Sequence, residues 1–293
     1  MFSEQEVGKV IQKILSLLLA FLMVLPAGGA ADPETDAAAE TPALSLFVIN
    51  VRKADALLLR CGSSTYLIDT GTEDGAPALL KVLQSEGITH LDGIILTHTD
   101  KDHVGGLEYL LDSDLEVDQV YASGYFKKKE NKHPAVQALK GTGQEVVWLL
   151  SGDSLPLDGG RMDVLGPLEK SEDKDDNNSL VILVTGGGGT MLLAGDMEFP
   201  EERSLLNAGL IPRADVLKVG NHGDDDATSE EFLAAVSPSV AVISTNSDDK
   251  PETPSNRVMN LLNRYGVTVY LTQETENGVL ITLTNGSIAA ESK

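Results

Sequence analysis

The segment ILTHTDKDHVGG, residues 95–106, decides how the rest of this sequence is interpreted. It follows an apolar run and places His98, Asp100, Asp102 and His103 within six positions. Alternate residues of an extended segment point to the same side, so His98 and Asp100 would share a face. Neutral imidazole and carboxylate are ligand types for divalent transition metals. The segment therefore predicts a metal site where a strand meets a helix.

A simpler interpretation makes this segment a polar strand-to-helix turn with Asp102 as the helix N-cap. Three further motifs favour the metal site. Asp69 in LIDTG, Asp196 in LLAGD and His222 in LKVGNHG each follow an apolar strand-like run. Each could be a turn, capping or solvated loop residue. An acid or a histidine at four strand ends is better explained by one shared metal cluster.

Short apolar runs alternate with helical patterns along most of the chain. We expect helices at 75–88, 104–113, 133–143, 198–209, 228–236 and 255–266. We expect strands at 44–51, 55–61, 65–71, 91–98, 119–124, 145–153, 161–167, 179–185, 190–196, 214–220, 240–245, 268–273 and 278–286. The last two strands are expected to pair. The pattern predicts an α/β fold in which two sheets pack together with helices outside.

The motifs LIDTG, THTDKDHVGG, LLAGD and LKVGNHG together resemble the metallo-β-lactamase superfamily, over roughly Leu44 to Gly286. FVINVRKADALLL is similar to the opening strand of its ComEC-like subgroup, named for the competence DNA-uptake protein. That subgroup carries His-x-Asp-x-Asp-His where other branches carry His-x-His-x-Asp-His. Asp100 and the strand start NNSLVILV fit the subgroup.

The resemblance implies a four-layer αββα sandwich with the site at one edge of the two sheets. It also implies a ligand set: His98 and Asp100 for one metal, Asp102, His103 and His222 for the second, and Asp196 bridging both. Asp69 would orient the cluster through hydrogen bonds. The third ligand of the first metal stays open between Asp176, Asn177 and Asn178.

The implied activity is that of an exported metal-dependent hydrolase, in the first place a phosphodiesterase. Two ions about 3.5–4 Å apart would share a hydroxide as nucleophile. Asp102 would accept its proton, and His222 or a water would protonate the leaving group. Lys218 would either contact a phosphate or be a solvated or core-rim lysine. The oxygen-rich ligand set moves the preference toward Mn²⁺ as well as Zn²⁺, and we expect two bound divalent ions, Zn²⁺ first and Mn²⁺ second.

The sequence departs from the subgroup at three places. Arg52-Lys53-Ala54-Asp55 stands where relatives have Gly-Gln-Gly-Asp, Asn221-His222 where many have two histidines, and Thr253-Pro254 where they have His-Pro. The first and third changes concern phosphate or substrate contacts and leave the implied metal ligands intact.

The net charge of −23 separates the candidate functions. Because non-specific DNA binding depends on Lys and Arg, this charge disfavours an extracellular DNA nuclease, which remains an alternative. Small phosphodiesters or phosphorylated envelope polymers are the expected substrates. The basic run Lys127-Lys128-Lys129 is interpreted as a solvated loop. A surface-binding or scaffolding protein with a decayed site is the alternative from another class, and β-lactam hydrolysis is disfavoured by Asp100.

The N-terminal segment predicts export. Lys9 and Lys13 precede the apolar run ILSLLLAFLMVL and the small residues PAGGAA, which is typical of a signal peptide spanning residues 1–31. The run is short for a membrane span, so we expect a secreted or extracytoplasmic protein without stable membrane insertion after cleavage. An uncleaved anchor is the alternative. Residues 32–43 are interpreted as a disordered linker and 44–290 as the hydrolase domain. Cys61, the only cysteine, allows no internal disulfide.

Overall fold

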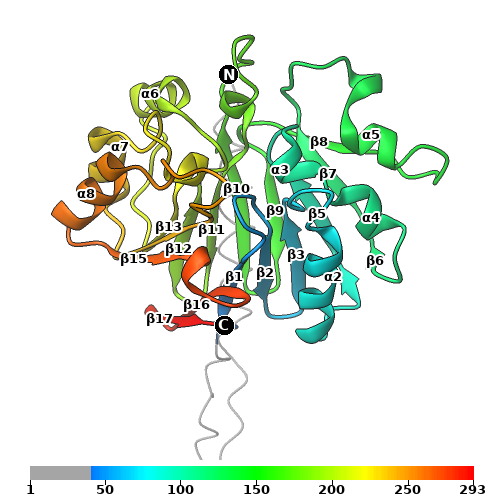
Figure 1. The fold of residues 1–293 in the computed structure, drawn as a ribbon, viewed down its shortest axis with the longest axis horizontal. Coiled ribbons are helices and arrows are strands. Elements are labelled where there is room, and N and C mark those ends of the chain that lie inside the picture. The colour runs from blue at the N-terminus through cyan, green and yellow to red at the C-terminus, as the bar shows by residue number, and fades with distance from the viewer. Residues whose placement is uncertain (1–40) are drawn as a thin grey trace, which may run out of the picture. The chain divides into compact units, whose positions relative to one another are not determined.

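The computed structural model describes residues 41–293 (Figure 1). The expected signal peptide, residues 1–31, lies outside the described residues, as does the expected linker apart from its last three residues. Among residues 41–293, no helix combines the length and apolarity that crossing a bilayer requires.

Two mixed sheets form the centre of this unit. The first has the order β17-β16-β1-β2-β3-β5-β7-β8, antiparallel from β17 to β3 and parallel from β3 to β8. Its strands are β1 (Leu44–Ile49), β2 (Leu57–Cys61), β3 (Ser64–Ile68), β5 (Gly93–Leu96), β7 (Val120–Ser123), β8 (Val147–Leu149), β16 (Gly278–Thr284) and β17 (Ser287–Ser292).

The second sheet has the order β15-β14-β13-β12-β11-β10-β9, parallel from β15 to β12 and antiparallel from β12 to β9. Its strands are β9 (Ser154–Leu157), β10 (Gly160–Gly166), β11 (Val181–Gly186), β12 (Gly189–Leu193), β13 (Val216–Lys218), β14 (Val240–Ile243) and β15 (Thr268–Leu271). A small ribbon joins β4 (His90–Leu91) to β6 (Glu116–Val117).

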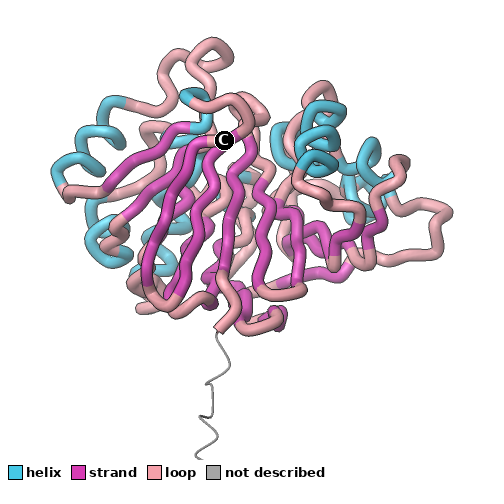
Figure 2. The backbone as a smooth tube through the Cα atoms, turned by 90° about the horizontal axis from the view of Figure 1, so that it is seen from below, coloured by secondary structure: helices cyan, strands magenta, loops and turns pink. Residues whose placement is uncertain are grey.

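The helices cover the outer faces of the two sheets (Figures 1 and 2). On the first sheet lie α2 (Ala76–Ser85), α3 (Lys101–Val104), α4 (Leu107–Leu111) and α5 (Pro134–Ala138). On the second lie α6 (Phe199–Asn207), α7 (Glu230–Val236) and α8 (Asn256–Arg264). Short 3-10 turns are η1 (Glu130–Lys132), η2 (Asp176–Asn178), η3 (Gly220–Gly223) and η4 (Thr272–Glu274).

Three apolar layers hold the four layers of backbone together. Along β1, Leu46 and Val48 enter the layer between the sheets, whereas Phe47 and Ile49 enter the layer beneath α2 and α4. Side chains of a strand alternate between faces, so a run that is apolar throughout can serve both layers. A third layer lies between the second sheet and α6–α8. The predicted αββα sandwich is confirmed.

The expected pairing of the last two strands is wrong. β15 pairs with β14 in the second sheet, and β16 pairs with β1 in the first. The chain crosses between the sheets through η4. β15 follows α8 and completes a parallel crossover, and β1 offers an open antiparallel edge to β16, so each strand finds a different partner.

The helix expected at 104–113 begins earlier and is broken. α3 and α4 are separated by Gly105 and Gly106, and Asp100 rather than Asp102 is the N-cap residue of α3. A Cβ on Gly106 would lie 2.3 Å from the carbonyl oxygen of Thr70, and one on Gly105 2.5 Å from the backbone nitrogen of Glu73. The glycine pair therefore lets this turn approach the loop that follows β3.

The edge strands β9 and β17 were not expected. β9 contains Pro156, and β17 is largely polar and exposed, so neither has the apolar run of an interior strand. Proline and polar residues are typical of edge strands, where one side of the backbone remains unpaired.

Candidate metal centre

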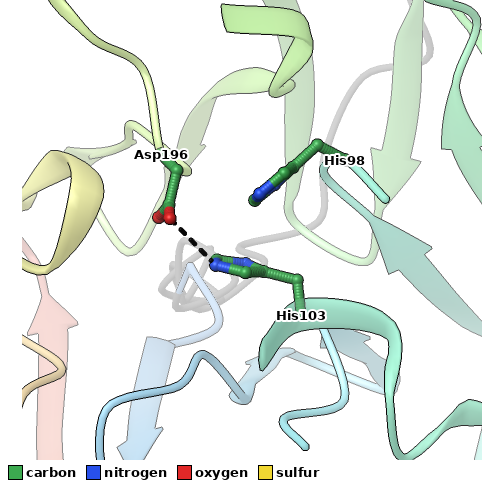
Figure 3. Close-up of side chains that lie close together, drawn as sticks. All are labelled: His98, His103 and Asp196. Carbon is green, nitrogen blue, oxygen red and sulfur yellow. Dashed lines mark ion pairs between the residues drawn. The ribbon is translucent and has the colours of Figure 1, made fainter. Parts of the chain in front are cut away.

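Strand ends of both sheets supply the site. Asp69 follows β3 and His98 follows β5, its parallel neighbour in the first sheet. Asp196 follows β12, and His222 lies in η3 after β13, the parallel neighbour of β12 in the second sheet. Parallel strands end at the same edge, so each sheet presents its residues together. Figure 3 shows His98 and His103 pointing toward Asp196, which comes from the opposite sheet.

The structure brings all six predicted metal ligands together in three overlapping groups. Within each group the potential ligand atoms lie within 4.8 Å of one another; the groups are His98–His103–Asp196, Asp102–His103–His222 and His98–Asp100–Asp176. A fourth group, Asp55–Asp69–His103, adjoins them.

Asp196 lies at the centre of the cluster. Its Oδ2 is 3.2 Å from Nε2 of His103 and 3.3 Å from Nε2 of His222. Nε2 of His222 is also 3.6 Å from Oδ2 of Asp102. The ring centroids of His98 and His103 are 4.1 Å apart. One carboxylate therefore reaches two of the imidazoles and adjoins the third.

Hydrogen bonds fix the tautomers of His103 and His222. Nδ1 of His222 lies 2.9 Å from the carbonyl oxygen of Ser244, which can only accept, so Nδ1 carries the proton. Nδ1 of His103 lies 2.7 Å from Oδ2 of Asp69 and donates to it. In both neutral rings the lone pair is then on Nε2, which faces the cluster.

The same holds for His98. Its Nδ1 lies 3.1 Å from the hydroxyls of Thr97 and Ser179. The Thr97 hydroxyl donates to Asp69 at 2.7 Å, so it can only accept from His98. All three imidazoles therefore present Nε2 as an acceptor. Metal-binding histidines typically donate their other ring N–H in this way.

Four inward-facing atoms have no hydrogen-bond partner among the described residues. They are Nε2 of His98, His103 and His222, and Oδ1 of Asp196. The three histidines are at most 1% exposed. An unpaired buried polar group costs about 1–3 kcal/mol, so a cluster of buried acceptors fits a bound cation. The donor set of imidazole and carboxylate fits a divalent transition metal.

Several carboxylates lie close together around His98. Burial, together with the negative charges of Asp196 and Asp100, raises the pKa of Asp176 to about 7. Burial alone would raise the pKa of Asp196, but His103 and His222, when both rings are protonated, outweigh it and hold this pKa well below its usual range. Among residues 41–293, no lysine or arginine lies within 4 Å of the carboxylate of Asp100 or Asp176; Asp176 has His98 at 3.9 Å.

Asp176 is the member of the open trio that reaches the cluster. Its Oδ1 lies 3.9 Å from Nε2 of His98. Asn177 donates instead to Glu198 at 2.8 Å, and Asn178 donates to Ser171 and Asp175, each at 3.0 Å. The two asparagines therefore stabilise the loop around η2 through hydrogen bonds, and Asp176 faces the site.

The turn that carries His222 has an unusual backbone. Asn221 and His222 both have left-handed φ values, 44° and 52°. Such conformations cost about 1–3 kcal/mol each in residues other than glycine and occur where the surroundings enforce them. The bond to Ser244 and the contact with Asp196 hold the imidazole there.

Sequence reasoning did not find the pairings of three charged residues at this site, Lys218, Asp55 and Lys53. Lys218 is buried, and its Nζ donates to Oδ2 of Asp55 at 2.8 Å and to the carbonyl oxygen of Val219 at 3.1 Å. Its ammonium group is buried and hydrogen-bonded to these two oxygens. Neither the phosphate contact nor the solvated position considered for Lys218 therefore fits. Lys53 donates to Oδ2 of Asp102 at 2.9 Å.

Residues 49–247 match the family model described as the metallo-beta-lactamase superfamily. The chain is 32% identical over 206 residues to ComE operon protein 3 of Bacillus subtilis, covering 70% of this chain and 26% of that protein. It is 31% identical over 229 residues to Recombination protein 2 of Haemophilus influenzae, covering 76% and 27%. The chain thus matches about a quarter of the length of these relatives.

Among solved structures, the metallo-beta-lactamase fold protein YhfI of Bacillus subtilis superposes with a TM-score of 0.55 at 14% identity. The match covers 82% of this chain and 99% of that protein. At this identity the likeness concerns the fold alone, and it agrees with the αββα layers described above.

Proposed function

The chain belongs to the metallo-beta-lactamase superfamily, whose ComEC-like members it resembles, and from this premise we propose that it is an exported metal-dependent phosphodiesterase. The fold and the candidate metal-binding residues make it a hydrolase of that superfamily. The phosphodiester substrate and the export are our proposals.

One observation carries the proposal more than any other. Three fully buried Nε2 atoms and one carboxylate oxygen converge without a hydrogen-bond partner in the described chain. A decayed site in a scaffolding protein would have no need to keep these acceptors unpaired, because each one costs stability.

We propose two cation positions. His98, Asp100 and Asp176 would hold the first, Asp102, His103 and His222 the second, and Asp196 both. Zn²⁺ is the first choice, and Mn²⁺ the second because of the many carboxylates. When bound, such cations polarise a phosphoryl oxygen and lower the pKa of a water toward about 7.

The residues around the cations have separate tasks. Asp102 lies at the mouth, with 26% of its side chain exposed. Burial would raise its pKa, but Lys53 and the protonated forms of His222 and His103 outweigh this and lower it, so Asp102 is ionised. We propose that this carboxylate accepts the proton of the attacking water. Lys53 fixes the orientation of that carboxylate.

Two roles were expected for His222, and they compete. A cation ligand needs the lone pair on Nε2, whereas a proton donor to the leaving group needs a proton there. With Nδ1 committed to Ser244, the ring has only Nε2 to offer. We therefore assign His222 to the ligand role and leave protonation of the leaving group to water.

A DNA nuclease is the second candidate. Its support is the similarity to ComE operon protein 3, which belongs to a competence operon by name. Against it stands the net charge of −23, because phosphate contacts need local cations.

The test is a panel of phosphomonoesters, phosphodiesters and carboxyl esters with Zn²⁺ and with Mn²⁺. We expect hydrolysis of bis-p-nitrophenyl phosphate and two ions per chain by metal analysis. Fewer than one ion per chain after incubation with both metals would overturn the proposal. Cleavage of single- or double-stranded DNA at a higher kcat/KM than both small diesters and a glycerol phosphate oligomer would favour the nuclease. The mass of protein recovered outside the expressing cells tests export and cleavage after residues 30 or 31.

A further inference from the structure

A hollow of about 470 Å³ lies directly beside the candidate site. Asp100 and Asp176, both in the His98 group, line it together with Asp173, Asp175 and Lys174. Two further lysines, Lys127 and Lys128, also line it. The two lysines belong to the run interpreted above as a solvated loop. They are exposed as expected, but they also form a wall of this hollow.

A buried carboxylate, that of Asp175, connects the segments that line the hollow. Asp175, 8% exposed, accepts hydrogen bonds from the backbone nitrogens of Thr99 at 3.1 Å and Lys127 at 3.0 Å. It also accepts from Nδ2 of Asn178 at 3.0 Å. It thereby ties together the segment after β5, the loop after β7 and the turn η2. The lysine loop is therefore anchored to the same segments that carry His98 and Asp176.

The ammonium groups of this wall are available to an anion. Nζ of Lys127 donates to the carbonyl oxygen of Asp173 at 2.5 Å, which keeps it at the hollow and leaves its other protons unused. Within residues 41–293, neither Lys127 nor Lys128 forms an ion pair with a carboxylate within 4 Å, whereas Lys174 pairs with Glu198 and Asp226. The other lysines at the site are paired, Lys53 with Asp102 and Lys218 with Asp55, so Lys127 and Lys128 are the ones left for an anion.

A neighbouring hollow limits how far this positive wall extends. It measures about 510 Å³, shares Thr99 and Lys128 with the first, and also contains Lys101. Three acids, Glu73, Asp74 and Glu108, line it as well. A further phosphate on that side would meet more negative than positive charge.

We propose that the hollow between Asp176 and Lys128 binds the phosphate next to the scissile one. This proposal, which rests on the proposed function, names the substrate class as a phosphodiester chain with at least two phosphates. The two proposed cations would hold the reacting phosphate, and Lys127 and Lys128 its neighbour. Because acids follow beyond Lys128, the preference saturates at two phosphates and does not grow with chain length.

The experiment compares substrates with one, two and three phosphodiesters. These are bis-p-nitrophenyl phosphate and the thymidine oligonucleotides with two and three internal diesters. A glycerol phosphate oligomer with two diesters distinguishes a nucleic acid from an envelope polymer as the source. The variant is K127A/K128A. The matched control is K129A/K132A, which removes two exposed lysines of the same segment that do not line the hollow.

We expect K127A/K128A to raise KM about 3- to 10-fold for substrates with two or three diesters, the range for two exposed ion pairs. KM for bis-p-nitrophenyl phosphate stays within about twofold, and the difference shrinks as salt screens the lysines. Lys128→Arg retains the wild-type KM. K129A/K132A changes none of these values.

Equal effects of the variant on one-phosphate and two-phosphate substrates, or the same rise in K129A/K132A, would overturn the subsite. If the wild-type protein hydrolyses no ester, the proposed function fails separately. The subsite is then judged by fluorescence anisotropy of a labelled phosphorothioate thymidine trimer. A dissociation constant weakened about 3- to 10-fold in K127A/K128A supports it, and unchanged binding refutes it.

Discussion

Asp69→Asn is expected to weaken cation binding while leaving the fold intact. Asp69 is fully buried and accepts three hydrogen bonds. His103 Nδ1 and the Thr97 hydroxyl donate to Oδ2, both at 2.7 Å, and the Thr97 backbone nitrogen donates to Oδ1 at 2.8 Å. An asparagine replaces one of these oxygens with a donor. At least one N–H or O–H would then face another donor instead of an acceptor.

The size of the effect follows from these contacts. One unpaired buried donor costs about 1–3 kcal/mol of folding free energy. Losing the carboxylate partner of a metal-binding imidazole typically costs about 10- to 100-fold in metal affinity, or about 1.4–2.7 kcal/mol. We therefore expect Zn²⁺ affinity to fall by that factor, and urea denaturation of the metal-free protein to show the folding loss of about 1–3 kcal/mol.

Competition with a chromophoric chelator measures the affinity. Asp92→Asn is the matched control, since this half-buried aspartate accepts from the Thr65 backbone nitrogen at the start of β3, away from the site. It should leave Zn²⁺ affinity unchanged. If Asp69→Asn binds Zn²⁺ as tightly as the wild-type protein, the argument that Asp69 orients His103 toward a cation is refuted.

Three further outcomes are expected. Lys218→Met should destabilise the protein by about 3–5 kcal/mol in urea, because it leaves the carboxylate of Asp55 buried without its cation; adding Asp55→Asn should recover part of this, and strictly additive losses would contradict a coupled pair. Burial, and then the charge of Glu202, raises the pKa of Glu201 well above its usual range, so the folded chain keeps a proton that the unfolded chain loses above about pH 4.5. The free energy of unfolding should therefore fall by about 1.4 kcal/mol per pH unit above that value until the folded pKa is reached. Glu201→Gln lacks this titration, so its free energy of unfolding relative to the wild-type protein should rise between pH 5 and 7. A stability difference between the two proteins that does not change with pH would count against the shift. Chelation should lower the thermal midpoint, since a ligand at 100 times its Kd stabilises by about 2.7 kcal/mol, and an unchanged midpoint in EDTA would argue against a resident cation.

The parts of the site that the sequence revealed are local. His98, Asp100, Asp102 and His103 lie within one turn, and Asp196 follows an apolar strand directly. Such motifs combine residue type with strand periodicity, and both can be read within a short window. The layer order was predictable for a similar reason, because strands that are apolar on both faces need cover on both sides.

The remaining features depend on partners far apart in the chain. Lys218 and Asp55 are separated by 163 positions. No local sequence pattern around either residue indicates that the two side chains pair. The choice of Asp176 over Asn177 and Asn178 depends on how η2 packs against Thr99 through Asp175. The separate sheets of β15 and β16 follow from which edges are open once both sheets exist.

The position of β16 has a consequence for how this protein is made. β1 pairs with β2 on one side and with β16, residues 278–284, on the other. While the chain emerges from a ribosome, the outer edge of β1 stays without its partner until more than 200 further residues have been synthesised. An unpaired apolar edge invites association with other chains. We expect nascent chains to need shielding at β1, and truncations that lose β16 to aggregate even though they retain every residue of the metal cluster.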